Sequence, residues 1–346
     1  MKAKIIPGYD SNRQTLSEII PIDTPFTLFI SPSQTCNFKC VYCSQSMNAN
    51  QKKQYGFSQK LQDFSLFVRL AHQAAEFPKK FKRVLLTGLG EPLTNPRIAE
   101  MVKMLAYLNV AEKYEVFTNA SLLTPELSKK LIEAGLTGLR ISVQGLTAKK
   151  YKEICGVNID FDTFVERIRF FYQNKGNCTV YIKIIDECLE GEQEREKFFK
   201  IFGDICDDIF VENLVKAQPM MGDYDGKVSN TKTFYGETAE KREVCPYMFY
   251  TLQTDSVGNA FPCPPLGLPH SFSLGNIEEK SLMEIWNGEK LKKLRISHLR
   301  KNNSKAAVCK QCTCYKAFTP KEDDLDASAD VILSRITTDK LKSCQG

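Results

Sequence analysis

The first residues of the sequence that can carry unusual chemistry are three cysteines, Cys36, Cys40 and Cys43, in the spacing Cys-x3-Cys-x2-Cys. Cysteine thiolates are ligands for zinc and for iron–sulfur clusters. A 4Fe–4S cluster normally takes four cysteines, so three leave one iron open to a ligand that the protein does not supply. A zinc site or a group of reduced thiols also fits this spacing, and these residues alone leave the alternatives open.

Four more cysteines in the C-terminal third form two pairs, Cys245 with Cys263 and Cys309 with Cys312. They are enough to ligate a second 4Fe–4S cluster completely, which would close it to substrate and make it an electron carrier. A structural zinc site is the alternative.

The composition favours metal ligation as the use of these thiols. The chain has thirteen cysteines in 346 residues, Met1–Asp10 lacks the features of a signal peptide, and no apolar run approaches the roughly 20 residues that cross a bilayer. We therefore expect a cytoplasmic protein with no membrane partner, in which structural disulfides do not persist. The net charge is +6, but the basic stretches Lys79–Arg83 and Lys290–Arg300 are predicted to be solvated helix faces or ends. Because aromatic residues do not cluster there, nucleic acid is not an expected partner.

The elements that position the first thiols are predicted from periodicity. Short β-rich apolar runs alternate with amphipathic stretches from about residue 26 to about residue 215, which predicts a parallel α/β sheet. The predicted strands are Phe26–Ile30, Val84–Thr87, Tyr114–Thr118, Leu139–Val143, Val180–Ile185 and Asp208–Glu212. The predicted helices are Phe64–Glu76, Asn95–Leu108, Pro125–Ala134, Phe161–Gln173 and Gly191–Phe202. Six βα units form a partial TIM-like barrel or an open wound sheet, with the chemistry at the C-terminal ends of the strands.

The pattern changes beyond the sixth unit, so we predict an α/β protein with five regions. They are an N-terminal extension (1–23), a partial (β/α)6 barrel (24–217), a linker (218–242), a small auxiliary domain (243–320) and a helical tail (321–346). The auxiliary domain is expected to be organised by a metal rather than by a large apolar core. It contains one clear predicted helix, Ser281–Leu299.

Four segments, in order along the chain, resemble the radical S-adenosylmethionine (SAM) superfamily over about residues 24–215. They are the first cysteine motif with Tyr42 before its last cysteine, Thr87–Leu93, Phe117–Leu123 and Arg140–Gly145. The second segment looks like the Gly-Gly-Glu segment of that superfamily, with Leu89 in place of the first glycine of the pair.

This resemblance implies that SAM chelates the open iron of a 4Fe–4S cluster bound by the first three cysteines. It assigns further cofactor contacts to Tyr42, Gly88, Gly90, Glu91, Asn119, Ser142 and Gln144. Tyr42 is expected against adenine, and Glu91 is expected to hold a glycine loop whose backbone can approach the methionine moiety. Ser142, Asn119 and Gln144 are expected to face the ribose or the carboxylate.

In such enzymes an electron from a flavodoxin- or ferredoxin-type donor splits SAM into methionine and a 5′-deoxyadenosyl radical, which takes hydrogen from an unactivated carbon. Of the cysteines outside both groups, Cys155, Cys178 and Cys206 are predicted to be small buried residues. Cys188, just after the fifth predicted strand, is a candidate to donate a hydrogen atom to a substrate radical.

A second resemblance covers about residues 243–314. Cys245–Tyr247, Asp255–Cys263 and Leu274–Asn287 are similar to the auxiliary-cluster domains called SPASM and twitch. The later cysteines are too few for the full SPASM pattern, so the resemblance implies one auxiliary 4Fe–4S cluster. Its expected ligands are Cys245, Cys263, Cys309 and Cys312, with Cys314 as a substitute for Cys312 and Cys344 left over.

Together the resemblances predict a radical SAM enzyme that acts on a small molecule or a peptide with help from an auxiliary cluster. Only 35 residues precede Cys36, too few for the leader-peptide-binding domain of many peptide-modifying relatives, which favours a small, carbohydrate-like substrate. A peptide maturase, an RNA-modifying enzyme and a zinc-stabilised binding module without turnover are the alternatives. Dehydrogenation, epimerisation and crosslinking all remain open.

Overall fold

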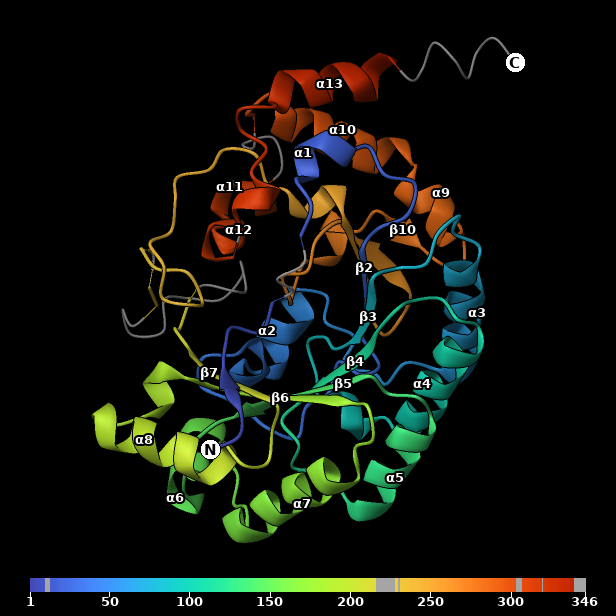
Figure 1. The fold of residues 1–346 in the computed structure, drawn as a ribbon. Coiled ribbons are helices and arrows are strands. Elements are labelled where there is room, and N and C mark those ends of the chain that lie inside the picture. The colour runs from blue at the N-terminus through green and yellow to red at the C-terminus, as the bar shows by residue number, and fades with distance from the viewer. Residues whose placement is uncertain (10–12, 216–227, 230, 303–306, 319, 339–346) are drawn as a thin grey trace.

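The computed structural model describes residues 1–9, 13–215, 228–229, 231–302, 307–318 and 320–338 (Figure 1). Its strands are β1 (Lys4–Ile5), β2 (Thr27–Ile30), β3 (Arg83–Leu86), β4 (Tyr114–Thr118), β5 (Gly138–Val143), β6 (Thr179–Ile185), β7 (Asp208–Glu212), β8 (Thr251–Thr254), β9 (Asn259–Phe261) and β10 (Gly275–Asn276). Its α-helices are α1 (Leu16–Ile19), α2 (Ala49–Gln54), α3 (Phe64–Ala75), α4 (Ile98–Tyr107), α5 (Pro125–Glu133), α6 (Ala148–Cys155), α7 (Phe161–Asn174), α8 (Gly191–Phe202), α9 (Leu282–Trp286), α10 (Glu289–Leu299), α11 (Ala307–Gln311), α12 (Cys314–Ala317) and α13 (Ala329–Thr338).

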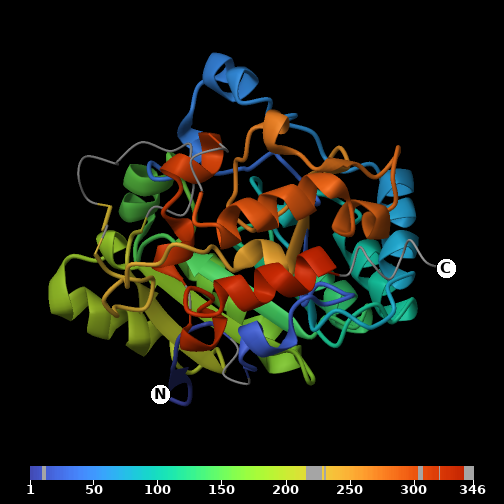
Figure 2. The same ribbon diagram turned by 90° about the horizontal axis from the view of Figure 1, so that it is seen from above.

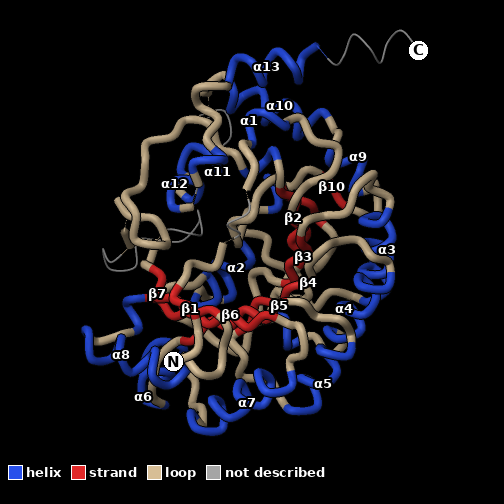
Figure 3. Tube along the Cα trace, viewed as in Figure 1, coloured by secondary structure: helices blue, strands red, loops and turns tan. Residues whose placement is uncertain are grey.

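These strands form one sheet in the order β1-β7-β6-β5-β4-β3-β2-β8-β9-β10. The pairings from β1 through β8 are parallel, and β9 and β10 add an antiparallel edge. The sheet curves into an arc with α3, α4, α5, α7 and α8 along its outer side (Figures 1 and 3). α10 and α13 lie at the end of the molecule opposite α5 and α7 (Figure 1), and seen from above they lie side by side (Figure 2). The predicted α/β class is therefore confirmed, and the six predicted strands are β2 to β7.

Local sequence explains how the outer helices begin and which face they bury. α3 starts after Asp63, whose carboxylate accepts the backbone N–H groups of Ser65 and Leu66 and so caps the helix. Residues at helical spacing then form its buried face, Phe67, Leu70, Ala71 and Ala74. α6 ends at Gly156, which adopts the left-handed conformation (φ 71°) typical of helix C-termini.

The sheet is wider than predicted at both edges. β1, from the predicted N-terminal extension, pairs with β7 so that Lys4 lies opposite Asp208. β8, from the predicted auxiliary domain, pairs with β2, and Thr27 lies opposite Thr251. The auxiliary domain is thus joined to the barrel sheet by main-chain hydrogen bonds.

Two local predictions were wrong. The predicted helix Ser281–Leu299 is two helices, α9 and α10, which are separated at Asn287 and Gly288. The stretch Lys79–Arg83 is not a helix end, because α3 ends at Ala75 and β3 begins at Arg83. Lys79 and Lys80 are exposed as predicted, whereas Lys82 and Arg83 line a cavity.

Some sequence predictions fall outside the described residues. Part of the predicted linker lies there, at 218–227 and 230, and so does Cys344. None of the helices within the described ranges has both the length and the apolar character that a membrane-spanning helix needs.

Candidate functional site

The loop that follows β2 carries the first three thiols, and we call residues 31–46 the thiol loop. Cys36, Cys40 and Cys43 all line one cavity of about 400 Å³ at the C-terminal ends of the strands. The outer side of the loop is fixed to the end of α6, because the backbone N–H groups of Lys39 and Val41 donate to the carbonyls of Cys155 and Ile154 at 3.0 and 2.9 Å. The predicted thiols therefore share one wall, at the predicted end of the sheet.

The donor set of the thiol loop suits an iron–sulfur cluster, since soft thiolates select such metals. Burial raises the pKa of Cys36 to about 12, and a bound cation is what would offset that cost and keep the thiolate. In the described part of the chain no three side chains already surround a metal position, and the sulfur of Cys40 lies 3.7 Å from that of Cys155. The thiols must therefore turn toward one another to share a cluster.

A glycine loop at the end of β3, residues 87–91, packs directly on the thiol loop. A Cβ on Gly90 would lie 2.2 Å from the Thr35 carbonyl oxygen, so only glycine allows this approach. The backbone N–H of Glu91 donates to the same carbonyl at 2.8 Å. Gln45 adds a further link by donating to the carbonyl of Leu89 at 2.7 Å. Sequence reasoning missed Gln45, because no motif marks it.

Glu91 connects this glycine loop to the end of β4. Its buried carboxylate accepts hydrogen bonds from the Thr118 hydroxyl (2.5 Å) and from the backbone N–H groups of Asn119 (2.7 Å) and Leu93 (3.0 Å). Desolvation by burial raises the pKa of Glu91 to about 7. Its three hydrogen bonds join the glycine loop to the end of β4, which agrees with the predicted loop-holding role.

The other predicted cofactor residues also line the first cavity, namely Tyr42, Gly88, Asn119, Ser142 and Gln144. The Asn119 amide is used within the protein, since it donates to Asn37 at 3.0 Å and accepts the Ser121 hydroxyl at 2.7 Å. The Tyr42 hydroxyl donates to the Gln144 side chain.

Cys188 is placed differently from the other predicted site residues. Its sulfur lies 3.8 Å from the hydroxyl of Tyr42, it is fully buried, and it lines neither this cavity nor the second one described below. The sulfur of Cys188 therefore faces neither cavity, and its role as a hydrogen donor stays a prediction.

The second thiol group gathers in the auxiliary domain. Burial raises the pKa of Cys263, and the nearby thiols that raise it further are Cys245, Cys312, Cys309 and Cys314. Five thiols from separate segments therefore lie near one another. Of these, Cys314 lines a second cavity of about 350 Å³ between the auxiliary domain and the inner face of the barrel.

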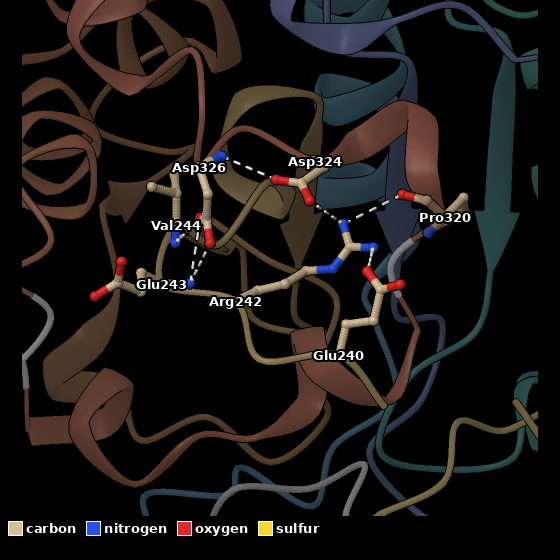
Figure 4. Close-up of polar contacts among 7 residues, drawn as sticks. All are labelled: Glu240, Arg242, Glu243, Val244, Pro320, Asp324 and Asp326. Atoms are coloured by element: carbon tan, nitrogen blue, oxygen red, sulfur yellow. Dashed lines mark hydrogen bonds and ion pairs between the residues drawn. The ribbon is translucent and has the colours of Figure 1, made fainter. Parts of the chain in front are cut away.

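The irregular segment that precedes Cys245 is fixed by the chain's C-terminal part (Figure 4). The backbone N–H groups of Glu243 and Val244 donate to the carboxylate of Asp326 at 3.0 and 2.8 Å. The guanidinium of Arg242 lies 3.6 Å from Asp324 and 3.1 Å from Glu240. These contacts set the position of Cys245.

The two cavities share a wall. Its residues are Phe29, Phe117, Lys183, Glu212, Phe234, Pro264 and Leu266. Lys183 and Glu212 form an ion pair there, with 2.6 Å between Nζ and Oε2. This pair was not identified from the sequence. The signal that could have found it is the charge of Lys183 within β6 and of Glu212 at the end of β7, two strands that are otherwise largely apolar. The second cavity therefore adjoins the cavity that holds the first thiols.

Comparisons with known proteins agree with this arrangement. Residues 30–194 match the family model described as Radical SAM superfamily, and residues 245–313 match the SPASM model, described as an iron–sulfur cluster-binding domain. A tungsten-containing aldehyde ferredoxin oxidoreductase cofactor-modifying protein of Pyrococcus furiosus is 23% identical over 311 residues, which are 76% of this chain and 81% of that protein.

Solved structures show the same fold. BtrN in complex with AdoMet and 2-DOIA has a TM-score of 0.52 and 18% identity, over 84% of this chain and 94% of that one. SuiB of Streptococcus suis bound to precursor peptide SuiA has a TM-score of 0.57 and 17% identity, over 86% of this chain and 71% of that one. At such low identity these likenesses concern the fold alone.

Proposed function

Because the chain belongs to the radical SAM superfamily and carries an iron–sulfur cluster-binding SPASM domain, as predicted from its sequence, we propose that it is an enzyme that cleaves SAM reductively to remove a hydrogen atom from a small-molecule substrate. One observation carries the proposal. The three thiols of the thiol loop and the glycine loop line one cavity, and that cavity shares a wall with a second one beside the auxiliary thiols. The protein is further proposed to be cytoplasmic.

In this proposal the residues of the first cavity hold the cofactors. Cys36, Cys40 and Cys43 bind the first cluster, and Ser142, whose side chain lines the cavity at the end of β5, contacts SAM. The phenylalanines of the shared wall keep water away from the reacting atoms.

The auxiliary thiols are proposed to bind a second cluster that exchanges electrons with the substrate site. Cys245, Cys263, Cys309 and Cys312 complete a four-thiol set, and Cys314, which faces the second cavity, remains outside it. A flavodoxin- or ferredoxin-type protein is the proposed electron donor to the first cluster.

The size of the second cavity supports a small substrate. Its volume of about 350 Å³ is near the lower end of the range typical of small-molecule sites. Oxidation or epimerisation of a small molecule is therefore the leading proposal. A peptide is the second candidate, supported by the fold shared with SuiB bound to precursor peptide SuiA.

The direct test is anaerobic reconstitution followed by reduction in the presence of SAM. We expect about eight irons per chain, as two four-iron clusters require, and release of 5′-deoxyadenosine. A variant with Cys36, Cys40 and Cys43 all changed to Ala should keep about four irons and lose the product. Cys178→Ala, outside both thiol groups, serves as the matched control. A colourless zinc protein, or equal product release by the triple variant, would contradict the proposal.

A further inference from the structure

The second cavity has a strongly cationic lining. Five basic side chains line it, namely Arg13, Lys82, Arg83, Arg140 and Lys183, against the two carboxylates of Glu212 and Asp323. We propose that this cavity binds a small molecule with an anionic group, a carboxylate or a phosphate, which Lys82 and Arg140 recognise. The proposal rests on the proposed function and names the substrate class of the same site.

Two of the cations are neutralised within the wall. Arg13 forms an ion pair with Asp323, and Lys183 forms one with Glu212 at 2.6 Å. These pairs account for both carboxylates that line the cavity. They contribute no net charge for a ligand.

Arg140 is held in place but is only weakly neutralised. Its Nε lies 3.3 Å from Glu115, and the same carboxylate also faces Arg83 at 3.4 Å. Both distances exceed the 2.7–2.9 Å or so of a strong charge-assisted hydrogen bond. The guanidinium also donates to the Gly8 carbonyl at 2.5 Å and lies near the rings of Phe117 and Tyr181. A fixed guanidinium with a shared counter-charge is suited to an incoming anion.

Lys82 supplies a second cation. Its ammonium lies 4.1 Å from the centre of the Phe26 ring, and the described residues show no carboxylate within ion-pair distance of it. Only 13% of the Arg140 side chain is exposed, so water screens this part of the cavity poorly. Electrostatic attraction is stronger in such a place than at an open surface.

Aromatic residues form much of the remaining wall, among them Tyr9, Phe26, Phe117, Tyr235 and Phe318. The rings of Tyr9, Tyr235 and Phe318 pack on one another with centroids 5.1 to 5.9 Å apart. An apolar wall beside fixed cations suits a ring-shaped body that carries an anionic group.

The test uses the reconstituted full-length protein and three probes that share one ring: phenyl phosphate, benzoate and uncharged benzyl alcohol. Anaerobic calorimetric titration should show at least tenfold tighter binding of one or both anions than of the alcohol. The tighter of the two anions identifies the phosphate or the carboxylate as the preferred group. Equal binding of all three probes, or no saturable binding of any up to millimolar concentration, overturns the inference.

Variants locate the site. Lys82→Gln should weaken anion binding at least tenfold, the change expected when one hydrogen bond to a charged group is lost, and Lys82→Arg should restore most of it. Lys79→Gln, in the same turn but exposed, is the matched control and should leave binding unchanged. If Lys82→Gln binds the anions as the wild type does, or Lys79→Gln weakens them equally, the site is wrongly assigned.

This test is separate from that of the proposed function, because binding is measured without reductant. Release of 5′-deoxyadenosine by a preparation that binds no anion would reject the anion site alone. Tight anion binding by a preparation that never cleaves SAM supports the anion site and rejects the proposed function alone.

Discussion

The contact between the glycine loop and the thiol loop makes Gly90→Ala the sharpest test of how the first cavity is built. The new Cβ would lie 2.2 Å from the carbonyl oxygen of Thr35 and 2.6 Å from that of Ser33, and both are backbone atoms that cannot rotate away. Ordinary contact requires the loops to separate by about 1 Å. Cys36 follows Thr35 directly, so its thiol moves with the loop.

A misplacement of about 1 Å at reacting groups typically lowers a rate about 100-fold. We therefore expect Gly90→Ala to release 5′-deoxyadenosine about 100-fold more slowly than the wild type, measured per bound four-iron cluster. Gly176→Ala is the control for the steric contact, because its Cβ would meet no atom within 4 Å, although Gly176, unlike Gly90, has a positive φ of 56°. Its rate should stay within a few-fold of the wild type.

Iron content must be measured first, because a displaced Cys36 can also weaken cluster binding. The reasoning is refuted if Gly90→Ala keeps its iron, responds to SAM in the EPR spectrum as the wild type does, and turns over at a similar rate. That result would show that the close approach at Gly90 does not set the position of the thiol loop.

Three further predictions follow from the site. Glu91→Gln should remove a pH dependence of stability. The pKa of Glu91 is raised from 4.5 to about 7 in the folded protein, so the folded state binds the proton more tightly than the unfolded state does. The wild-type free energy of unfolding should therefore fall by about 3 kcal/mol between pH 4.5 and 7. Denaturant unfolding of metal-free wild type and variant checks this, and parallel curves would contradict it. Asp326→Ala leaves the N–H groups of Glu243 and Val244 without their acceptor. Iron analysis should then show loss of up to about four irons per chain, with 5′-deoxyadenosine release retained. Full iron content would show that the Asp326 contacts do not set the position of Cys245. Ser142→Ala should raise the Kd for SAM roughly tenfold if the hydroxyl donates to SAM, and an unchanged Kd would remove that contact.

The barrel strands could be predicted from sequence because each is a short apolar run between turn residues. The six runs became β2 to β7, and their C-terminal ends bring the first thiols and Glu91 into one cavity. In that part of the chain, local pattern and final structure agree.

The missed elements depend on partners that are distant in sequence. β1 has two residues and is a strand only because β7 lies beside it, and β8 joins β2 across more than two hundred residues. Asn287 and Gly288 divide a helix that periodicity alone would continue. Lys82 looked like part of a solvated basic stretch, because nothing local indicates that the cavity lies behind β3.

The hydrogen bonds from residues 243 and 244 to Asp326 also bear on the order in which parts of the protein reach their final structure during synthesis. The acceptor for Val244 comes 82 residues later in the chain, whereas the α6 carbonyls that fix the thiol loop lie at 154 and 155. At ordinary elongation rates the ribosome needs roughly 10 to 30 s to travel from residue 155 to residue 326. The contacts that fix Lys39 and Val41 of the thiol loop to α6 can therefore form on the nascent chain, whereas the segment before Cys245 must wait until nearly the whole polypeptide has been made.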